Sequence, residues 1–238
     1  MEGDDRTIVN LLTDQVEFAD VIILNKTDLV DDKTLQLLHA AIAKLNPAAR
    51  ILHTVFGKVE PEQILNTGLF DFEKAQNAAG WIAELNNEHT PETEAYGISS
   101  FVFRNKRPFH PERFWKYLNE QYPANIIRAK GLFWLASRPD DAINFSQAGG
   151  SSRIEKAGVW WCSMPYAERI RYSYFADNKQ VIESHWDKKW GDRMNEIVFI
   201  GQEMDKEQIV SELNNCLLAD TELFMYETRM KFKDEFPV

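Results

Sequence analysis

A short, unbroken apolar run near the start of the chain, Val21–Leu24, stands between two amphipathic segments. Four consecutive apolar residues are typical of a parallel strand that is covered on both faces. The flanking segments carry apolar residues at helical spacing, namely Ile8, Leu11, Leu12, Val16 and Ala19 before the run and Leu35, Leu38, Ile42 and Leu45 after it. Residues 50–55 are predicted to form the next strand. The order helix, strand, helix, strand predicts an α/β layer with a parallel sheet.

The pattern in the second half of the chain predicts a different architecture. Strands are expected at residues 98–104, 126–136, 142–147, 153–161 and 195–200, and helices at residues 111–120 and 206–218. Pro111 suits the first turn of the earlier helix. This order predicts an α+β domain with mostly antiparallel pairing and a split β-α-β arrangement of the ferredoxin-like type.

A polar stretch separates the two parts. Residues 86–94 offer no apolar anchor, which is typical of a linker. We therefore expect residues 1–85 to belong to one domain, residues 86–95 to be the linker, and residues 96–238 to form the second domain.

Composition and charge narrow the class of protein. The 238 residues are 44% hydrophobic, enough to bury a core, and the net charge of −10 disfavours binding to nucleic acid or to anionic membranes. The sequence contains no apolar stretch long enough to span a bilayer, and Met1–Asp5 lacks the basic and apolar parts of a secretion signal. We expect a folded cytoplasmic protein that binds neither nucleic acid nor a membrane.

The predicted strand Val21–Leu24 ends in Asn25, Lys26, Thr27 and Asp28. The carboxylate of Asp28 can accept hydrogen bonds from both the ring N–H and the amino group of guanine, whereas adenine has no matching donors. The stem of Lys26 can lie along a base face, and the amide of Asn25 can tie neighbouring loops together. The pattern Asn-Lys-x-Asp at the end of a parallel strand therefore predicts a guanine-binding site. The alternative is that Asn25 or Asp28 only caps the helix that follows.

The sequence contains no Gly-x-x-x-x-Gly-Lys-Ser/Thr loop to hold phosphates and magnesium. Gly57-Lys58 is followed by Val59, and residues 149–152, Gly-Gly-Ser-Ser, are predicted to form an ordinary turn. We expect the chain to carry the base-binding half of a GTPase site without its phosphate and magnesium half. Hydrolysis by the chain alone is not expected, and no catalytic residue is assigned.

Candidate metal ligands are few. Cys162 and Cys216 are too far apart in sequence for a zinc knuckle and are expected to be buried thiols. His89 lies among glutamates of the predicted linker, and a loop of that kind holds metal weakly. His110 is the second candidate, but a structural imidazole at a helix start is the favoured interpretation. No metal ligand is assigned.

Several blocks of the second half, in order along the chain, resemble the carboxyl-terminal domain of CobW-like proteins. They are Tyr96–Arg104, Arg107–Phe114, Arg128–Gly131, Gln147–Gly150, Gly158–Trp161 and Glu196–Gly201. In that family a P-loop GTPase domain precedes this domain, and the resemblance implies that residues 1–85 are the carboxyl-terminal portion of such a domain. The family's phosphate loop, magnesium-binding acids and Cys-x-Cys-Cys metal element belong to a segment upstream of Met1.

The resemblance further implies a GTP-dependent metallochaperone, with GTP and magnesium as cofactors of the complete family protein and zinc as the usual metal proposed for this branch. Asn25, Lys26 and Asp28 would bind guanine, and the second domain would couple nucleotide state to a client metalloprotein. The missing GTPase segment, or a chain that supplies it, is a further expected partner. Because the first sheet lacks its earlier strands, it should expose an edge and an apolar face through which copies of the chain associate.

Two alternatives belong to other classes of function. The chain could be a non-enzymatic protein-interaction module that has lost nucleotide binding. It could also bind single-stranded RNA by stacking bases on strand aromatics, which are Phe101, Phe103, Phe133, Trp134, Trp160 and Trp161. The negative charge of the chain and the usual role of such aromatics favour core packing.

Overall fold

The computed structural model describes residues 8–71, 80–85, 96–228 and 231–237. The predicted linker, residues 86–95, lies outside the described residues. The amino-terminal part consists of α1 (Ile8–Phe18), β1 (Val21–Leu24), the 3-10 helix η1 (Thr27–Leu29), α2 (Asp32–Leu45), β2 (Arg50–His53), the 3-10 helix η2 (Pro61–Gln63) and α4 (Gly80–Leu85). β1 and β2 pair in parallel, with Val21 opposite Arg50 and Leu24 opposite His53. The predicted order of helix, strand, helix, strand is therefore confirmed.

The two-sided burial predicted for the strand at residues 21–24 is wrong. Ile23 on β1 is 42% exposed, so the strand is not covered on both faces. The apolar stripe of α1 is also largely exposed, with Ile8 at 77% and Leu12 at 55%. α1 instead buries Glu17 completely. Among the described residues β1 and β2 pair only with each other, and the expected exposed apolar surface is present at Ile23 and on α1.

The remainder of the chain forms a larger unit. Its elements are β3 (Ile98–Asn105), α5 (Pro111–Lys116) with the π turn η4 (Tyr117–Gln121), β4 (Ile126–Leu135), β5 (Arg138–Ala148), β6 (Ser151–Val159), η5 (Trp161–Ser163), α6 (Tyr166–Arg169), α7 (Ser173–Ser184), β7 (Asn195–Gln202), α8 (Lys206–Cys216), η6 (Asp220–Glu222) and α9 (Leu223–Glu227). The predicted strand at 153–161 is too long, because β6 ends at Val159 and Trp161 begins a 3-10 helix. Helices α6 and α7 were not predicted.

The five strands form one antiparallel sheet in the order β3-β7-β4-β5-β6. β3 and β4, which α5 connects along the chain, are separated by β7, which is antiparallel to both. A mixed α/β fold with one parallel and one antiparallel sheet is thus confirmed, while the ferredoxin-like description stays a prediction.

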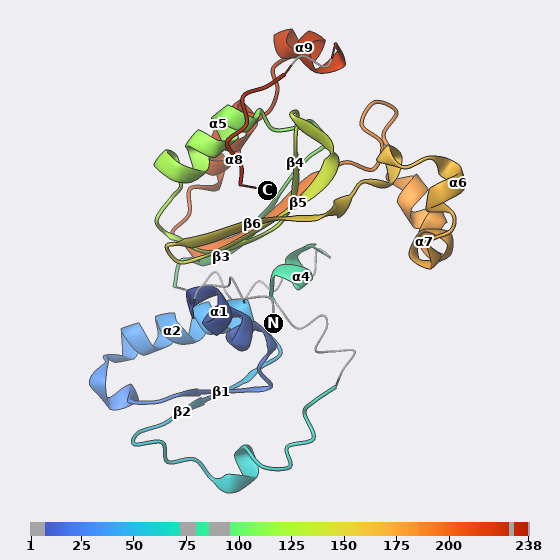
Figure 1. Cartoon of the computed structure of the whole chain (residues 1–238). Coiled ribbons are helices and arrows are strands. Elements are labelled where there is room, and N and C mark those ends of the chain that lie inside the picture. Colours follow the sequence, from blue (N-terminus) through green and yellow to red (C-terminus); the bar gives the residue numbers. More distant parts are fainter. Residues whose placement is uncertain (1–7, 72–79, 86–95, 229–230, 238) are drawn as a thin grey trace.

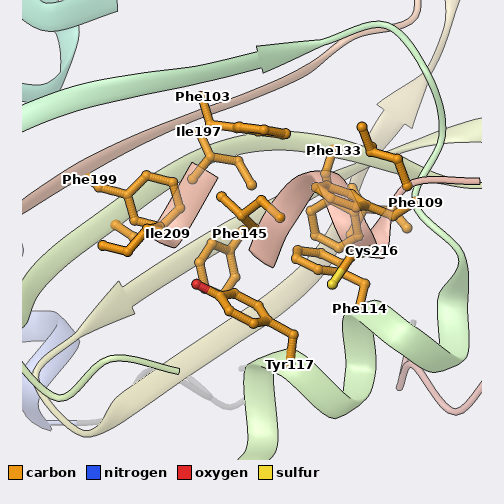
Figure 2. Close-up of a cluster of buried hydrophobic side chains, with 14 of the residues drawn as sticks. Phe103, Phe109, Phe114, Tyr117, Phe133, Phe145, Ile197, Phe199, Ile209 and Cys216 are labelled. Carbon is orange, nitrogen blue, oxygen red and sulfur yellow. The ribbon is translucent and has the colours of Figure 1, made fainter. Parts of the chain in front are cut away.

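Helices cover both faces of the five-stranded sheet (Figure 1). On one face, α5 and α8 enclose an aromatic core that includes Phe109, Phe114, Phe133 and Phe199 (Figure 2). On the other face, Leu45 of α2 packs with Val198 and Ile200 of β7, and side chains of α1 and α4 join them. The sheet is therefore the middle layer of three.

Most of the strand aromatics proposed as RNA-stacking residues belong to the core. Phe101, Phe103, Phe133, Trp134 and Trp160 are all at most 9% exposed. Trp161 is half-buried and its ring lies 5.1 Å from that of Phe175. Core packing is confirmed for the five buried rings, which present no open platform for bases. Among the described residues, no helix has the length and apolar character to cross a bilayer.

Two buried ion pairs join layers of the molecule. Arg128 on β4 and Glu17 on α1 have side chains that are 1% and 0% exposed, and Nε of Arg128 lies 2.7 Å from Oε1 of Glu17. Lys44 on α2 contacts Glu84 on α4 at 2.6 Å. Burying a charge without a partner is costly, so each pair fixes where its helices lie.

Candidate nucleotide-base site

The candidate site lies where β1 and β2 end. The two strands are parallel, so their carboxyl ends meet at one edge, where ligands bind in sheets of this type. Residues 25–28 come directly after β1, and residues 54–57 come directly after β2. The structure therefore brings two loops together, of which the sequence analysis assigned only the first.

The side chain of Asn25 joins these loops. Its Oδ1 accepts hydrogen bonds from the backbone N–H of Lys26 at 2.8 Å, from Oγ1 of Thr54 at 3.2 Å and from the backbone N–H of Gly57 at 2.9 Å. An amide oxygen with three donors is held firmly, because each lost bond would leave a polar group without a partner. Asn25 therefore takes the loop-tying role predicted for it.

Thr27 and Thr54 form a second connection between the loops. Both the backbone N–H and the hydroxyl of Thr27 donate to the carbonyl oxygen of Thr54, at 3.2 and 3.1 Å. The backbone N–H of Thr54 in turn donates to the carbonyl of Leu24 at 2.8 Å. The loop after β1 is thus fixed to the end of β2 by backbone as well as side-chain contacts.

Two residues of the site hold left-handed backbone conformations. Lys26 has a φ of 62° and Phe56 a φ of 55°. Such angles are uncommon for residues with a side chain and persist only where surrounding contacts enforce them. The hydrogen bond from the backbone N–H of Lys26 to Asn25 holds the conformation of Lys26. Phe56 precedes Gly57, whose backbone N–H also donates to Asn25, so Phe56 belongs to the same hydrogen-bond network.

Asp28 lies in the first turn of η1, and its side chain is exposed, as are those of Asn25 and Lys26. Asp31, not Asp28 or Asn25, caps α2, because its carboxylate accepts from the backbone N–H of Thr34 at 2.8 Å. Hydrogen bonding to Thr34 is the main cause of the lowered pKa of Asp31. The interpretation that Asn25 or Asp28 serves only as a helix cap is therefore wrong.

The residues missed by sequence reasoning are Thr54, Phe56 and Gly57. Thr54 is buried and bonded to Asn25, whereas Phe56 is 84% exposed beside the anchored loop. A signal for them was available, because two parallel strands of equal length end side by side and the loops after residues 24 and 53 must therefore meet. An exposed aromatic ring at this position can stack on a base.

The fit to a guanine nucleotide can be judged from these groups. The base half fits, because an exposed carboxylate, an anchored amide and a lysine stem stand at the open edge of a parallel sheet. The phosphate half would need backbone donors and a magnesium ligand that no motif of this sequence supplies. This chain's residues therefore fit the base of GTP and not its triphosphate.

The cysteines and His110 have structural surroundings. Burial raises the pKa values of Cys162 and Cys216 to about 11, so both thiols stay protonated at neutral pH. Nδ1 of His110 accepts from the backbone N–H of Arg113 at 3.5 Å at the start of α5, and burial lowers the pKa of this imidazole. His110 thus has the structural role that was favoured for it, and His89 lies outside the described residues.

Comparison with known proteins settles the family. Residues 98–217, about half of the chain, match the cobalamin synthesis protein cobW C-terminal domain, and residues 1–53 match the CobW/HypB/UreG nucleotide-binding domain. The chain belongs to the CobW family. The resemblance inferred from the sequence blocks is thereby confirmed, and Asn25, Lys26 and Asp28 lie in the segment that matches the nucleotide-binding domain.

Individual relatives of this CobW chain carry zinc-related names. It is 40% identical over 227 residues to zinc-regulated GTPase metalloprotein activator 1 of Dictyostelium discoideum, a match that covers 94% of the chain and 47% of that relative. It is 28% identical over 240 residues to a zinc chaperone of Mycobacterium tuberculosis, covering 98% and 55%. Among solved structures, zinc-bound YjiA GTPase from E. coli matches at 19% identity with a TM-score of 0.41, covering 87% of this chain and 54% of that one. The chain spans about half the length of the curated relatives it matches.

Proposed function

We propose that this chain is part of a CobW-type, GTP-binding zinc metallochaperone. Asn25, Lys26 and Asp28 bind the guanine base, and the domain of residues 96–238 couples nucleotide state to a client metalloprotein. The observation that carries the proposal is the anchored loop: three donors hold the Asn25 carboxamide while the Asp28 carboxylate remains exposed at the ends of parallel strands. The names of the two relatives support a role in zinc handling.

Each segment of the chain has its own role in this proposal. Residues 1–85 are the end of a P-loop GTPase domain, residues 86–95 link it to a carboxyl-terminal domain of ferredoxin-like type, and the complete protein acts in the cytoplasm. The phosphates of GTP and its magnesium ion are held by a segment upstream or by another chain that supplies it. Zinc is the cargo of the complete protein. In this chain the base-binding residues orient the nucleotide and exclude adenine.

The test is purine selectivity after the phosphate-binding segment of a relative has been joined to this chain. The fusion should bind GDP in preference to ADP, and Asp28→Ala should reduce that preference about 100-fold or more, because two hydrogen bonds to a charged group are lost. Asp28→Asn should gain affinity for xanthosine diphosphate, whose 2-oxo group accepts from an amide. Equilibrium titration with fluorescent nucleotides measures all three.

Asp177→Ala is the matched control, because Asp177 is an exposed aspartate on α7 in the other part of the molecule. Circular dichroism verifies that each variant remains folded. If Asp28→Ala discriminates purines as well as the parent does, the base-binding role is refuted. A folded fusion that binds no guanine nucleotide at all would favour the non-enzymatic interaction module.

A further inference from the structure

Two histidines meet on the amino-terminal part of the molecule. His39 lies on α2, and His53 is the last residue of β2. Nδ1 of His39 is 3.0 Å from Nε2 of His53, and the two rings are nearly perpendicular, with centroids 5.1 Å apart. His39 is half-buried and His53 is exposed, so solvent reaches the pair.

The pair lines a cavity of about 450 Å³. Other polar side chains on its wall are Asp32 and Gln36 of α2 and Tyr96. Asp32 and Gln36 stand seven and three positions before His39, so all three share one side of the helix. The cavity therefore combines nitrogen donors with oxygen-bearing side chains and room for water.

The separation of the two ring nitrogens is close to that of two ligands on one metal ion. Zinc binds histidine nitrogen at about 2.0–2.1 Å, and a tetrahedral angle then places two such nitrogens about 3.3 Å apart. Opening the observed contact by a few tenths of an ångström would admit the ion. Both ligands come from elements whose backbones are fixed, His53 by its pairing with Leu24 and His39 by its helix.

We infer that His39 and His53 form a binding site for a divalent transition-metal ion such as Zn²⁺, completed by water in the cavity that Asp32 also lines. Imidazole nitrogen is a preferred ligand of these ions. In the metal-free protein one ring donates its N–H to the other, and metal binding requires that ring to shift its proton to the opposite nitrogen. The inference does not depend on the proposed guanine site, which assigns no metal ligand.

The described residues contain no group of three or more His, Cys, Asp or Glu side chains arranged to hold a metal. The protein thus supplies two firm ligands, and water fills the remaining positions. Structural zinc sites have four protein ligands, whereas sites with open positions exchange ligands. The His39–His53 site is of the second kind, suited to accepting and releasing an ion.

The inference can be tested on the chain itself, stripped of metal with a chelator. Zn²⁺ should bind with a component of one equivalent, measured by competition with a chromophoric chelator, and Co²⁺ should develop visible absorption bands. His39→Asn and His53→Asn should each weaken that component at least about tenfold, because even the loss of a group that only supports a ligand has an effect of that size. In NMR spectra, the imidazole signals of His39 and His53 should shift before those of other histidines.

The matched control is His185→Asn, which changes another histidine at the end of α7. This variant should bind zinc as the parent does. Circular dichroism and the unfolding midpoint establish that the His39 and His53 variants remain folded. Unchanged affinity in both folded variants would overturn the inference, as would an equal loss of affinity in His185→Asn or the absence of any one-equivalent binding in the parent chain.

Discussion

Glu222 holds the Arg113 guanidinium with both carboxylate oxygens, at 2.6 and 2.7 Å. Oε2 also accepts the backbone N–H of Ala219 at 2.7 Å. The hydrogen bonds from Arg113 are the largest cause of a lowered pKa for Glu222, from 4.5 to about 2, against a smaller opposing effect of burial. This one side chain therefore ties the segment after α8 to α5.

The ion pair predicts a pH dependence of stability. Because the folded protein lowers the pKa of Glu222, its contribution is fully present above about pH 4.5 and is lost as the pH falls toward about 2. Glu222→Gln should lower the free energy of unfolding at pH 6, and the difference from the parent should shrink between pH 4.5 and 2.5. Urea titrations at several pH values measure it. Glu227→Gln, on the exposed Lys189–Glu227 pair, serves as control, and a difference that does not vary with pH would contradict the prediction.

At the residue scale, the sequence was enough to single out side chains that lie next to one another along the chain. Asn25, Lys26 and Asp28 adjoin one strand, so a tetrapeptide was enough to single them out, although their base-binding role stays a prediction. The burial of Glu17 was not foreseeable, because it depends on Arg128, which lies more than a hundred positions away. The His39–His53 contact, between residues 14 positions apart, was missed because one residue is on a helix and the other on a strand, and their packing is not visible in either periodic pattern.

At the scale of elements, the attachment of α1 to the five-stranded sheet depends on a buried charge. Nε and Nη2 of Arg128 donate to the two carboxylate oxygens of Glu17 at 2.7 and 3.1 Å, and Asp14 lies 3.4 Å from Nη2. Most of the apolar side chains of α1 are exposed to solvent, so hydrophobic contacts contribute little to holding α1 on the sheet. The ion pair therefore anchors α1 to the five-stranded sheet.

Removing one partner of the Arg128–Glu17 ion pair should strongly lower the free energy of unfolding. Glu17→Gln removes the buried carboxylate, leaves the Arg128 guanidinium with Asp14 at 3.4 Å as its nearest acidic partner, and should lower the free energy of unfolding by up to about 3–5 kcal/mol. Glu196→Gln removes a pair of similar length, with Arg104, in which both side chains are 35% exposed, and should cost less than about 1 kcal/mol. Urea unfolding followed by tryptophan fluorescence measures both. Equal costs for the two variants would show that burial of the Glu17 pair contributes nothing.

Element prediction succeeded where an apolar pattern was present. The strands β3, β4 and β7 carry buried side chains along most of their length, and their ranges were predicted to within about two residues. α7 escaped prediction because Phe175 is its only buried residue and the rest of the helix faces solvent. A helix without an apolar stripe leaves no periodic signal in the sequence.

At the scale of the whole molecule, the two-stranded sheet β1–β2 has unpaired edges within the described part of the chain. Ile23 on β1 and the stripe of α1 add exposed apolar surface beside it. Unpaired edges and apolar patches promote pairing between chains. We expect isolated copies of the chain to associate through this surface.

Sedimentation velocity over a range of protein concentrations should show association of this chain. Ile23→Lys places a charge on the exposed strand and should weaken association. Val181→Lys, at a 62% exposed site on α7, is the matched control and should leave it unchanged. A concentration-independent monomer with uniformly strong amide protection across residues 8–60 would refute the expectation.

The place of Glu17 in the chain has a mechanical consequence. Glu17, which pairs with Arg128 of β4, is separated from Asn25 only by the end of α1 and by β1. Asn46 donates to the carbonyls of Val16 and Ala19, on either side of Glu17, at 2.8 Å each. A rigid displacement of β1 must either carry the distant sheet with it or pull two desolvated charges apart, which costs several kcal/mol. The proposed base-binding residues after β1 are thus joined to the five-stranded sheet by a short and rigid stretch of chain.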